Sequence, residues 1–596
     1  MIKLALIAVF MLFSHNSAYG ADMTAAIPFP DSKPPISKKR IENLKQDKNA
    51  VNTKGLLKNK TDQPLNNYQL RLYREIFKAQ AKGNWRDANI YIRKIDNPVL
   101  IGHVLIQRYQ HPGYKTSQNE YIEWMRNFKD HPQSKIVDQI LRTGRSTYQT
   151  RVNGTLEELR YFSRGSKYIS DKYKSGERYE LNLVRKMLAE YLSDGKVSAA
   201  LNAFETHKVQ AYIDPIDKSQ ILAEIASYYL YLGHPKQARA TSLKALKASD
   251  KAPLAGWVMG LASYINGDMA TAAKYFTVAS NAPYASPWMT SAAAYWAGRA
   301  YMKDKNFPEV TPMLTKAVQN QRTFYGLLAT KTKGYGFDFN WTMPTLDVDH
   351  KRLMLKNKVG ARILALAETG QLALAEDELF ALPVKDDPAL AEAALAVAHY
   401  YNLAGYALRF SSSMNNPAGG YYDSGLFPIS SWTKDRKYKD QALLNAFIRQ
   451  ESKFRIGAKN PTGATGLMQV MPATAAYITK DDVYKTIKGQ KILSNPAKNI
   501  DIGSAYLEHL LELKTVDNDL FSLAIAYNAG PGNLSRWKKA IGSDDPLLFI
   551  ELIPSSETRA FVERIMTNYW IYQMQMGIEP YTLQAVAEGR WPKLDN

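Results

Sequence analysis

The sequence contains no cysteine among its 596 residues. Disulfides, thiol nucleophiles and cysteine-ligated zinc are therefore excluded, and packing alone must stabilise the fold. Acidic residues are also in deficit, with 56 Asp and Glu against 77 Lys and Arg, which gives a formal net charge of +21. Such a charge attracts polyanions of several kinds, namely nucleic acid, anionic lipid head groups and acidic cell-wall glycans. Charge alone does not choose among them.

Long apolar runs are also scarce. The longest N-terminal run, residues 4–13, is too short to span a bilayer comfortably, and no later stretch is long enough to do so. It follows Lys3 and precedes the small residues at 18–20, which is the pattern of a secretory signal. We therefore predict a signal peptide at residues 1–20. The mature protein is expected to be exported to the periplasm without a stable membrane anchor, away from nucleic acid.

The rest of the chain divides by composition. Residues 21–65 are rich in Lys and Pro and are interpreted as a basic arm. From residue 66 onward, a glycine that follows an apolar helical pattern is repeatedly followed, five residues later, by an alanine. The pairs are Gly83/Ala88, Gly195/Ala200, Gly233/Ala238, Gly267/Ala272 and Gly370/Ala375. Glycine ends the first helix of a hairpin and alanine lets the second approach closely. The spacing resembles tetratricopeptide-like hairpins, so residues 66–321 are predicted to form an α-superhelix.

Two further units complete an all-α architecture. Glycines, prolines and aromatics interrupt the helical pattern near residues 324–344, and a helical linker domain is predicted at 322–425. The Ser-, Asn-, Gly- and Pro-rich stretch at 411–431 marks the boundary with a compact helical domain at 426–596.

A carboxylate stands on an apolar helix stripe in this last domain. Glu451 follows Leu444, Phe447 and Ile448 by seven, four and three residues, so all four side chains share one face. Burial there disfavours the charged form and raises the pKa of the carboxyl group, as a general acid for glycosidic cleavage requires. A buried structural glutamate is the alternative reading of this position alone.

Several motifs with polar or flexible side chains follow Glu451. The stretch GLMQ, residues 466–469, lies on a glycine-opened loop, and AYNAG, residues 526–530, ends a helix. Glu557 lies one turn before Phe561. Each feature also has a packing explanation. His509 and Glu512 are spaced like metal ligands, but no second histidine completes a site, so no metal or other cofactor is expected.

Together the motifs resemble one family. ES after an apolar helix, GATGLMQVMPATA, AYNAGPG and IPSSETRAFV occur in the order found in the soluble lytic murein transglycosylases. The upstream hairpins and FYGLLA are similar to the superhelical region of the large members. The resemblance implies a lysozyme-like catalytic domain after the superhelix. It also implies cleavage of the MurNAc-β-1,4-GlcNAc bond of peptidoglycan without water, giving 1,6-anhydro-MurNAc ends, with exo-action expected.

The resemblance also assigns roles to residues. Glu451 is implied to act first as acid and then as base, because the substrate N-acetyl group replaces the second carboxylate of ordinary glycosidases. The implied substrate-binding residues are Ser452, Met468, Gln469, Tyr527, Asn528, Ala529, Glu557 and Tyr569. Peptidoglycan glycan strands are the expected partner of a monomer, and no protein partner is identified. Two alternatives stay open, a catalytically silent peptidoglycan-binding scaffold and a hydrolase that uses water.

Overall fold

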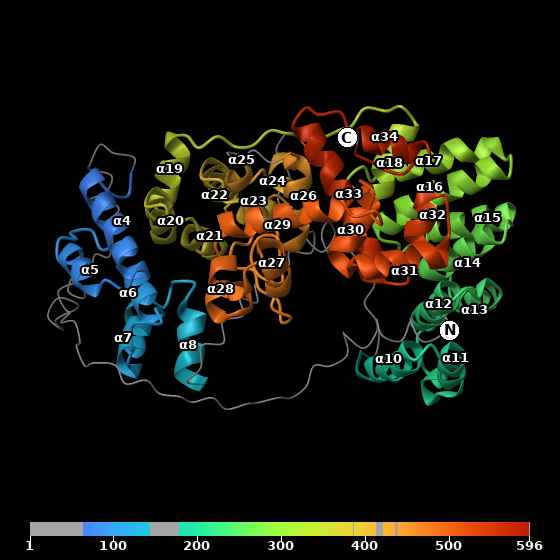
Figure 1. The fold of residues 1–596 in the computed structure, drawn as a ribbon, viewed down its shortest axis with the longest axis horizontal. Helices are drawn as coiled ribbons and strands as arrows, with labels where there is room; N and C mark the ends of the chain where they lie inside the picture. Colours follow the sequence, from blue (N-terminus) through green and yellow to red (C-terminus); the bar gives the residue numbers. More distant parts are fainter. Residues whose placement is uncertain (1–62, 144–177, 385–386, 413–420, 435–438, 595–596) are drawn as a thin grey trace.

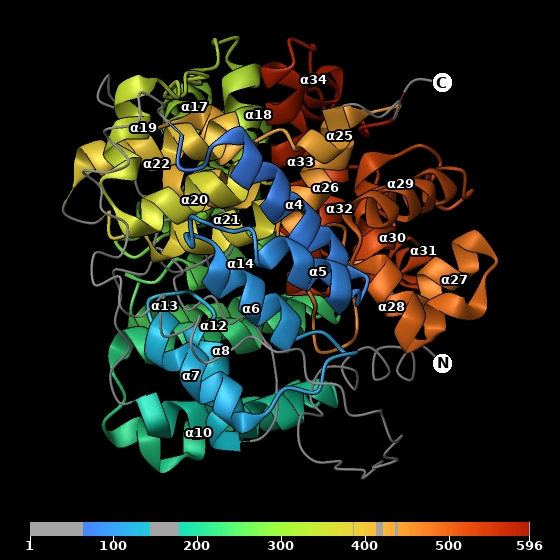
Figure 2. The same ribbon diagram turned by 90° about the vertical axis from the view of Figure 1, so that its left-hand side faces the viewer.

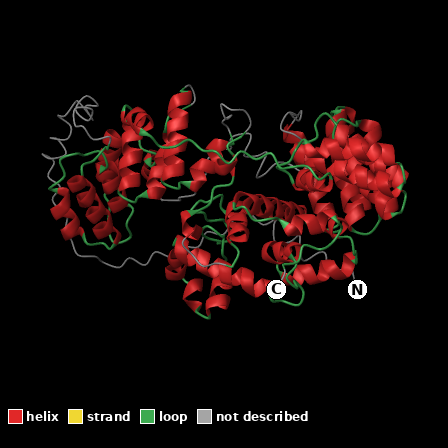
Figure 3. Ribbon diagram, turned by 90° about the horizontal axis from the view of Figure 1, so that it is seen from above, coloured by secondary structure: helices red, strands yellow, loops and turns green. Residues whose placement is uncertain are grey.

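The computed structural model describes residues 63–143, 178–384, 387–412, 421–434 and 439–594 (Figure 1). The predicted signal peptide and nearly all of the basic arm lie outside the described residues. Over the described ranges, regular secondary structure is helical and strand-like pairing is limited to isolated β-bridges (Figure 3). The predicted all-α class is confirmed. None of the described helices combines the length and apolar character needed to cross a bilayer.

Helical hairpins form at every glycine–alanine pair. They are α4 (Asn67–Ala81) with α5 (Trp85–Ile92), α10 (Arg178–Ser193) with α11 (Val197–Thr206), α12 (Pro215–Tyr231) with α13 (Pro235–Ala248), α14 (Leu254–Ile265) with α15 (Met269–Asn281), and α20 (Lys358–Glu368) with α21 (Leu372–Ala381). All five glycines have φ between 70° and 80°, a left-handed conformation that glycine adopts without strain. All five alanines are fully buried. Local sequence therefore determined the hairpin turns.

Two more hairpins turn at a left-handed residue that is not glycine. Lys305 (φ 62°) ends the turn between α16 (Pro287–Lys303) and α17 (Val310–Val318), and Val310 takes the alanine position. Asn402 (φ 54°) does the same between α22 (Pro388–Tyr400) and α23 (Ala404–Ser411). Asparagine tolerates left-handed backbone, whereas for lysine the conformation costs free energy that hairpin packing must offset.

The remaining helices complete the arrangement. Upstream of residue 440 they are α6 (Ile101–Tyr109), α7 (Gln118–Phe128), α8 (Ser134–Thr143), η2 (Lys208–Ala211), η3 (Phe307–Glu309), α18 (Phe324–Thr332), α19 (Val348–Leu355), α24 (Asp423–Leu426) and α25 (Ser431–Lys434). Along the long axis of the molecule, α4–α8 and α19–α22 lie at one end and α10–α17 at the other (Figure 1). Most of the chain after residue 440 lies between these two groups, while its last helix, α34 (Tyr581–Ala587), packs on α18.

The N-terminal helices pack on the linker helices. Tyr73, Ile76 and Val104 share a buried apolar cluster with Ile363 and Leu395, although more than 250 residues separate them in sequence. Figure 2 views this end of the molecule, where α4 crosses α20 and α21. The contact joins the first described helices to the linker segment.

A buried ionic network accompanies that cluster. Glu378 of α21 is fully buried and accepts hydrogen bonds from Arg362 (2.8 and 3.0 Å) and from the His103 ring (2.8 Å). Arg362 also pairs with Asp130 at 2.7 Å. Burial lowers the pKa of His103 to about 4, against the opposing attraction of Glu378. His103 is thus neutral near pH 7, and Arg362 supplies the charge that compensates Glu378.

Arg362→Met tests this network. The variant leaves Glu378 buried beside a neutral histidine, and breaking a buried ion pair from one side costs about 3 kcal/mol. We expect a clearly lower thermal unfolding midpoint in circular dichroism. Arg352→Met is the matched control, because its ion pair with Asp349 is exposed and contributes little. Equal midpoints for the two variants would contradict the role given to Arg362.

Buried and half-buried contacts join α16, α18 and the end of α12 to the C-terminal helices. They are the ion pair Arg299–Asp545 (2.6 Å), the hydrogen bond from Tyr325 to Glu551 (2.6 Å), and the stacked rings of Phe324 and Trp570 (5.4 Å). The guanidinium of Arg559 also lies 4.3 Å from the ring of Tyr231, at the end of α12. These contacts seat the C-terminal helices against the hairpins on one side.

Candidate active site

Glu451 is the last residue of α26 (Gln441–Glu451). Asp440 caps the start of this helix by accepting a hydrogen bond from the Leu443 amide. Leu444, Phe447 and Ile448 are all buried, as the apolar stripe predicts. Because Glu451 shares their face at the end of the helix, its carboxyl group is set against packed apolar side chains and keeps partial exposure.

The setting changes the acidity of Glu451. Burial, the larger cause, and the negative charge of Glu557 together raise the pKa of its carboxyl group to about 8. Glu557 itself is exposed, in the first turn of α33 (Ser556–Gln575). A carboxylic acid with such a pKa is largely protonated at neutral pH. It can therefore donate a proton to a leaving oxygen.

A tightly folded loop follows α26 and carries GLMQ. Thr465 and Val470 exchange backbone hydrogen bonds of 3.1 Å, and the Gly466 amide donates to the Ala458 carbonyl at 2.7 Å. Gln469 spans the loop, since its side-chain amide donates to the carbonyls of Ala458 (3.1 Å) and Gly466 (2.9 Å). Gln469 thus holds the loop with its NH₂ group, which leaves only its carbonyl oxygen for a ligand.

Met468 anchors the loop through its backbone. Its amide donates to Asn499 (2.8 Å) and its carbonyl accepts from the Tyr527 hydroxyl (2.7 Å). The Met468 side chain is fully buried and packs on Gly503 of α29 (Pro496–Leu511). The structure therefore places this predicted substrate-binding side chain in the core beneath the loop.

Tyr527 connects the loop to the helix of Glu451. It lies near the end of α30 (Leu520–Ala529), and its ring packs on Phe447 with centroids 4.8 Å apart, one turn before Glu451. Burial raises the pKa of the Tyr527 hydroxyl well above its usual value, and the nearby charge of Glu451 adds to the effect. Tyr527 therefore stays neutral and fixes Met468 relative to Glu451.

Asn528 connects α30 to α33. Its side-chain oxygen accepts a hydrogen bond from the Thr558 hydroxyl at 2.8 Å, which sets the start of α33, and with it Glu557, beside the end of α30. Within the described part of the chain the Asn528 NH₂ group has no protein partner, so it remains available to a ligand. The Ala529 carbonyl accepts from Asn533 at 2.6 Å.

The remaining two predicted substrate-binding residues, Ser452 and Tyr569, are buried and bond to groups of α26 or its cap. Ser452 is buried directly after Glu451, and its hydroxyl donates to the Ile448 carbonyl at 3.1 Å. Tyr569 is buried and donates to Asp440 at 2.7 Å, at the opposite end of α26 from Glu451. The structure thus brings Glu451, Tyr527 and Glu557 together. It places the Tyr569 hydroxyl at the start of α26, and the substrate-binding role of Tyr569 stays a prediction.

Comparison with known proteins identifies this region. A family model described as the transglycosylase SLT domain matches residues 429–549. This segment matches the SLT domain, and that name is used below for the C-terminal helical domain that contains it. The match contains Glu451, the GLMQ loop, Tyr527 and Asn528, and it ends before Glu557. The resemblance to the soluble lytic murein transglycosylases that the motifs indicated is confirmed.

Relatives of the SLT domain extend the comparison. A soluble lytic murein transglycosylase of Escherichia coli K12 is 29% identical over 304 residues, 50% of this chain. A Salmonella typhimurium protein of the same description is 37% identical over 157 residues, 25% of this chain. These matches span 46% and 24% of the two relatives, respectively.

A solved structure shares the fold over a longer range. It is the 70-kDa soluble lytic transglycosylase of Escherichia coli, with a TM-score of 0.53 at 17% identity, covering 88% of this chain and 99% of that one. At that identity the likeness shows a common fold. The predicted order, an α-superhelix followed by a lysozyme-like domain, is confirmed.

The SLT domain contains supporting residues that the motifs did not reveal. Asn499 is fully buried and donates to the carbonyls of Thr465 (2.7 Å) and Leu493 (3.0 Å) while it accepts from Met468. Arg449 is buried on α26 and donates to Asn568 of α33 at 2.7 Å. An Asn within a predicted helix and an Arg near its end carry no distinguishing sequence signal, because their partners are distant in the chain.

The helices of the C-terminal domain not yet given are α27 (Pro472–Thr479), η4 (Asp482–Lys485), α28 (Ile487–Leu493), α31 (Pro531–Ile541) and α32 (Pro546–Glu551).

Proposed function

We propose that this protein is a peptidoglycan lytic transglycosylase that cleaves the MurNAc-β-1,4-GlcNAc bond and leaves 1,6-anhydro-MurNAc ends. The observation that carries the proposal is Glu451, a partly buried carboxyl group with a pKa of about 8 at the end of an apolar helix in an SLT domain. The relatives' descriptions support the substrate class.

The first half of the reaction uses Glu451 as an acid. Its proton passes to the glycosidic oxygen, the bond from that oxygen to C1 of MurNAc breaks, and GlcNAc leaves as an alcohol. The N-acetyl oxygen of MurNAc bonds to C1 as the glycosidic bond breaks, and the positive charge is then spread over the N-acetyl group. Glu451 becomes a carboxylate, which burial and Glu557 make a stronger base than an ordinary carboxylate.

The second half uses the same group as a base. The Glu451 carboxylate accepts the proton of the C6 hydroxyl of MurNAc, and the C6 oxygen bonds to C1 as the N-acetyl oxygen is displaced. Glu451 is protonated again and the enzyme is regenerated. A raised pKa favours both steps, because one group must donate a proton and then recover one near neutral pH. Glu557 acts on the pKa of Glu451 and takes no proton.

The remaining parts of the proposal concern where the protein acts, how the glycan strand enters and what the other site residues do. We propose that the protein acts as a periplasmic monomer on glycan strands, attracted by its net charge of +21. The hairpins on one side of the SLT domain and the linker helices on the other favour a strand entering by its end, and hence exo-action (Figure 1). Ser452, Met468, Gln469, Ala529 and Tyr569 act chiefly by holding Glu451 and the loop in place, while Asn528 contacts the sugar.

Product masses test the proposal. Purified sacculi are digested with the wild-type protein, and the soluble fragments are analysed over time by mass spectrometry. Anhydro-ended disaccharide units from the earliest times support an exo-acting lytic transglycosylase. Fragments heavier by one water would identify a hydrolase, and long anhydro-ended fragments would contradict exo-action. Binding without any release would favour a scaffold.

The pH dependence of the rate follows from Glu451. Because the protonated form is required, kcat/KM should fall about tenfold per pH unit above pH 8.

Glu557→Gln removes a negative neighbour, which lowers the pKa of Glu451 and moves this fall to lower pH. Asp501→Asn, a carboxyl removal on α29 that is not among the groups acting on Glu451, is the control and should leave the profile unchanged. A Glu557→Gln profile identical to that of the wild type would contradict the coupling.

A further inference from the structure

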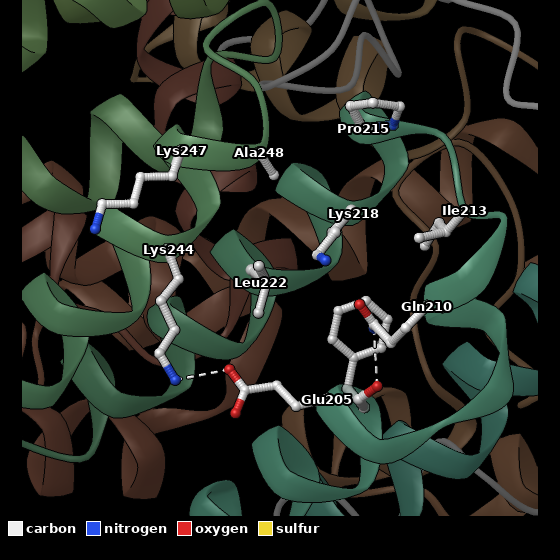
Figure 4. Close-up of a pocket in the computed structure, with 10 residues that line it drawn as sticks. Glu205, Gln210, Ile213, Pro215, Lys218, Leu222, Lys244, Lys247 and Ala248 are labelled. Carbon is white, nitrogen blue, oxygen red and sulfur yellow. Dashed lines mark hydrogen bonds and ion pairs between the residues drawn. The ribbon is translucent and has the colours of Figure 1, made fainter.

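A cavity of about 580 Å³ lies in the superhelix, away from Glu451. It opens between α11, η2, α12 and α13 (Figure 4). A volume of this size suits a small ligand or a short peptide. Its inner wall is apolar and is formed by Phe204 and Leu222, both buried, with Ile213, Pro215 and Ala248 nearer the opening.

The rim of the cavity is cationic. Three of the lining residues are lysines and one, Glu205, is acidic. Glu205 is already paired with Lys244 at 2.7 Å, as the dashed line in Figure 4 shows. Among the described residues, no side chain pairs with the ammonium groups of Lys218 or Lys247. The half-buried Lys218 extends over the cavity, whereas the exposed Lys247 directs its ammonium group away from Lys218 (Figure 4). The flexible stem of Lys247 allows this group to turn toward a ligand in the cavity.

A hydrogen-bond acceptor stands beside these cations. Gln210 uses its NH₂ group to donate to the Phe204 carbonyl at 2.9 Å. Its side-chain oxygen has no partner within the described part of the chain, and can accept an N–H group. An acidic peptide fits these groups. Its carboxylates can pair with the two lysines, its amide N–H can donate to Gln210, and its aliphatic side chains can pack on the apolar wall. Sugar rings would instead find no exposed aromatic platform here, because Phe204 is fully buried.

We propose that this cavity binds the acidic peptide stem of the glycan substrate, with Lys218 and Lys247 pairing with its carboxylates. This inference rests on the proposed function for the identity of the peptide.

The cavity also has a physical link to the active site through α12. Lys218 lies near one end of that helix, and Tyr231 at the other contacts Arg559, two residues after Glu557. Thirteen residues of helix place the two points about 20 Å apart.

A stem bound there would hold the strand at a second point on the superhelix, separate from the sugars at Glu451. Cleavage of strands that carry stems should therefore show a lower KM than cleavage of strands without them, with kcat little changed. Such a split distinguishes a binding site for the stem from a structural effect on the SLT domain.

Isothermal titration calorimetry with the free acidic stem peptide tests the proposal on the full chain. The peptide should bind the wild type, and Lys218→Ala/Lys247→Ala should weaken binding at least about tenfold, since each charged contact is lost. Lys236→Ala, an exposed lysine on α13 outside the cavity, is the matched control and should bind as the wild type does. Lys218→Arg/Lys247→Arg, which keeps both charges, should restore most of the affinity.

Two results overturn the inference, absence of peptide binding by the wild type and unchanged binding by the double alanine variant. Digestion of sacculi is measured separately. Digestion without peptide binding would remove this inference and leave the proposed function intact. Lysine-dependent peptide binding without digestion would support the cavity as a peptide site and remove the proposed function.

Discussion

Glu451→Gln is expected to reduce the rate of sacculus digestion by about 10³- to 10⁴-fold. The amide keeps the shape of the carboxyl group but can neither donate the first proton nor recover the second, so both halves of the reaction fail. The fold should survive, because the carboxyl group is not tied into the hydrogen-bond network that holds α26. That network runs through Asp440 at the start of the helix and Arg449 near its end.

The controls separate chemistry from structure. The thermal unfolding midpoint of Glu451→Gln at neutral pH should equal that of the wild type, because the amide and the protonated carboxyl group are both neutral. Glu557→Gln should retain most of its activity at its own pH optimum, since Glu557 tunes Glu451 without reacting. Turnover of Glu451→Gln within tenfold of the wild type would contradict the assignment of Glu451 as the acid.

Gly466→Ala is expected to reduce activity about 10²-fold and to lower stability. Gly466 has φ 81°, and a Cβ atom there would lie 2.3 Å from Nδ2 of Asn499, so backbone strain and a clash act together. Asn499 holds the Met468 amide, and Met468 in turn holds Tyr527. Displacing the loop therefore misplaces the side chains around Glu451, and a displacement near 1 Å is enough to cost this much activity.

Two other glycines in the same loop make matched controls. Gly463 has φ 96° but open space around it, so Gly463→Ala should cost about 1 kcal/mol of stability from backbone strain alone. Gly457 has neither the left-handed backbone nor a close neighbour, so Gly457→Ala should behave as the wild type. Activity assays and thermal unfolding of the three variants should rank them in this order. Equal effects of Gly466→Ala and Gly463→Ala would exclude the contact with Asn499 as the cause.

Features with a short repeat could be predicted from the sequence. The stripe that ends at Glu451 has the period of a helix, and burial of Leu444, Phe447 and Ile448 follows from it. The hairpin glycines are left-handed for the same local reason, since the turn requires a conformation that glycine adopts readily. Lys305 occupies the same turn position, and no propensity would have suggested it, because the packing of α16 on α17 compensates for its strain.

Features that depend on distant partners could not be predicted. Glu378 has an ordinary sequence context, and only the fold brings His103 and Arg362 to it from other helices. Asn499 is equally inconspicuous. The roles implied for Met468 and Tyr569 stay predictions. The motif did not indicate that the Met468 side chain is fully buried or that the Tyr569 hydroxyl donates a hydrogen bond to Asp440.

The central claim is that one glutamate cleaves the glycan with no water in the product, and heavy-oxygen water tests it most directly. Sacculi are digested by the wild-type protein in water enriched in the heavy oxygen isotope, and the new MurNAc ends are analysed by mass spectrometry. We predict that these ends carry no heavy oxygen, because the C6 hydroxyl of the sugar supplies the new bond to C1. One heavy oxygen at each new end would show that water is the nucleophile and would contradict the account.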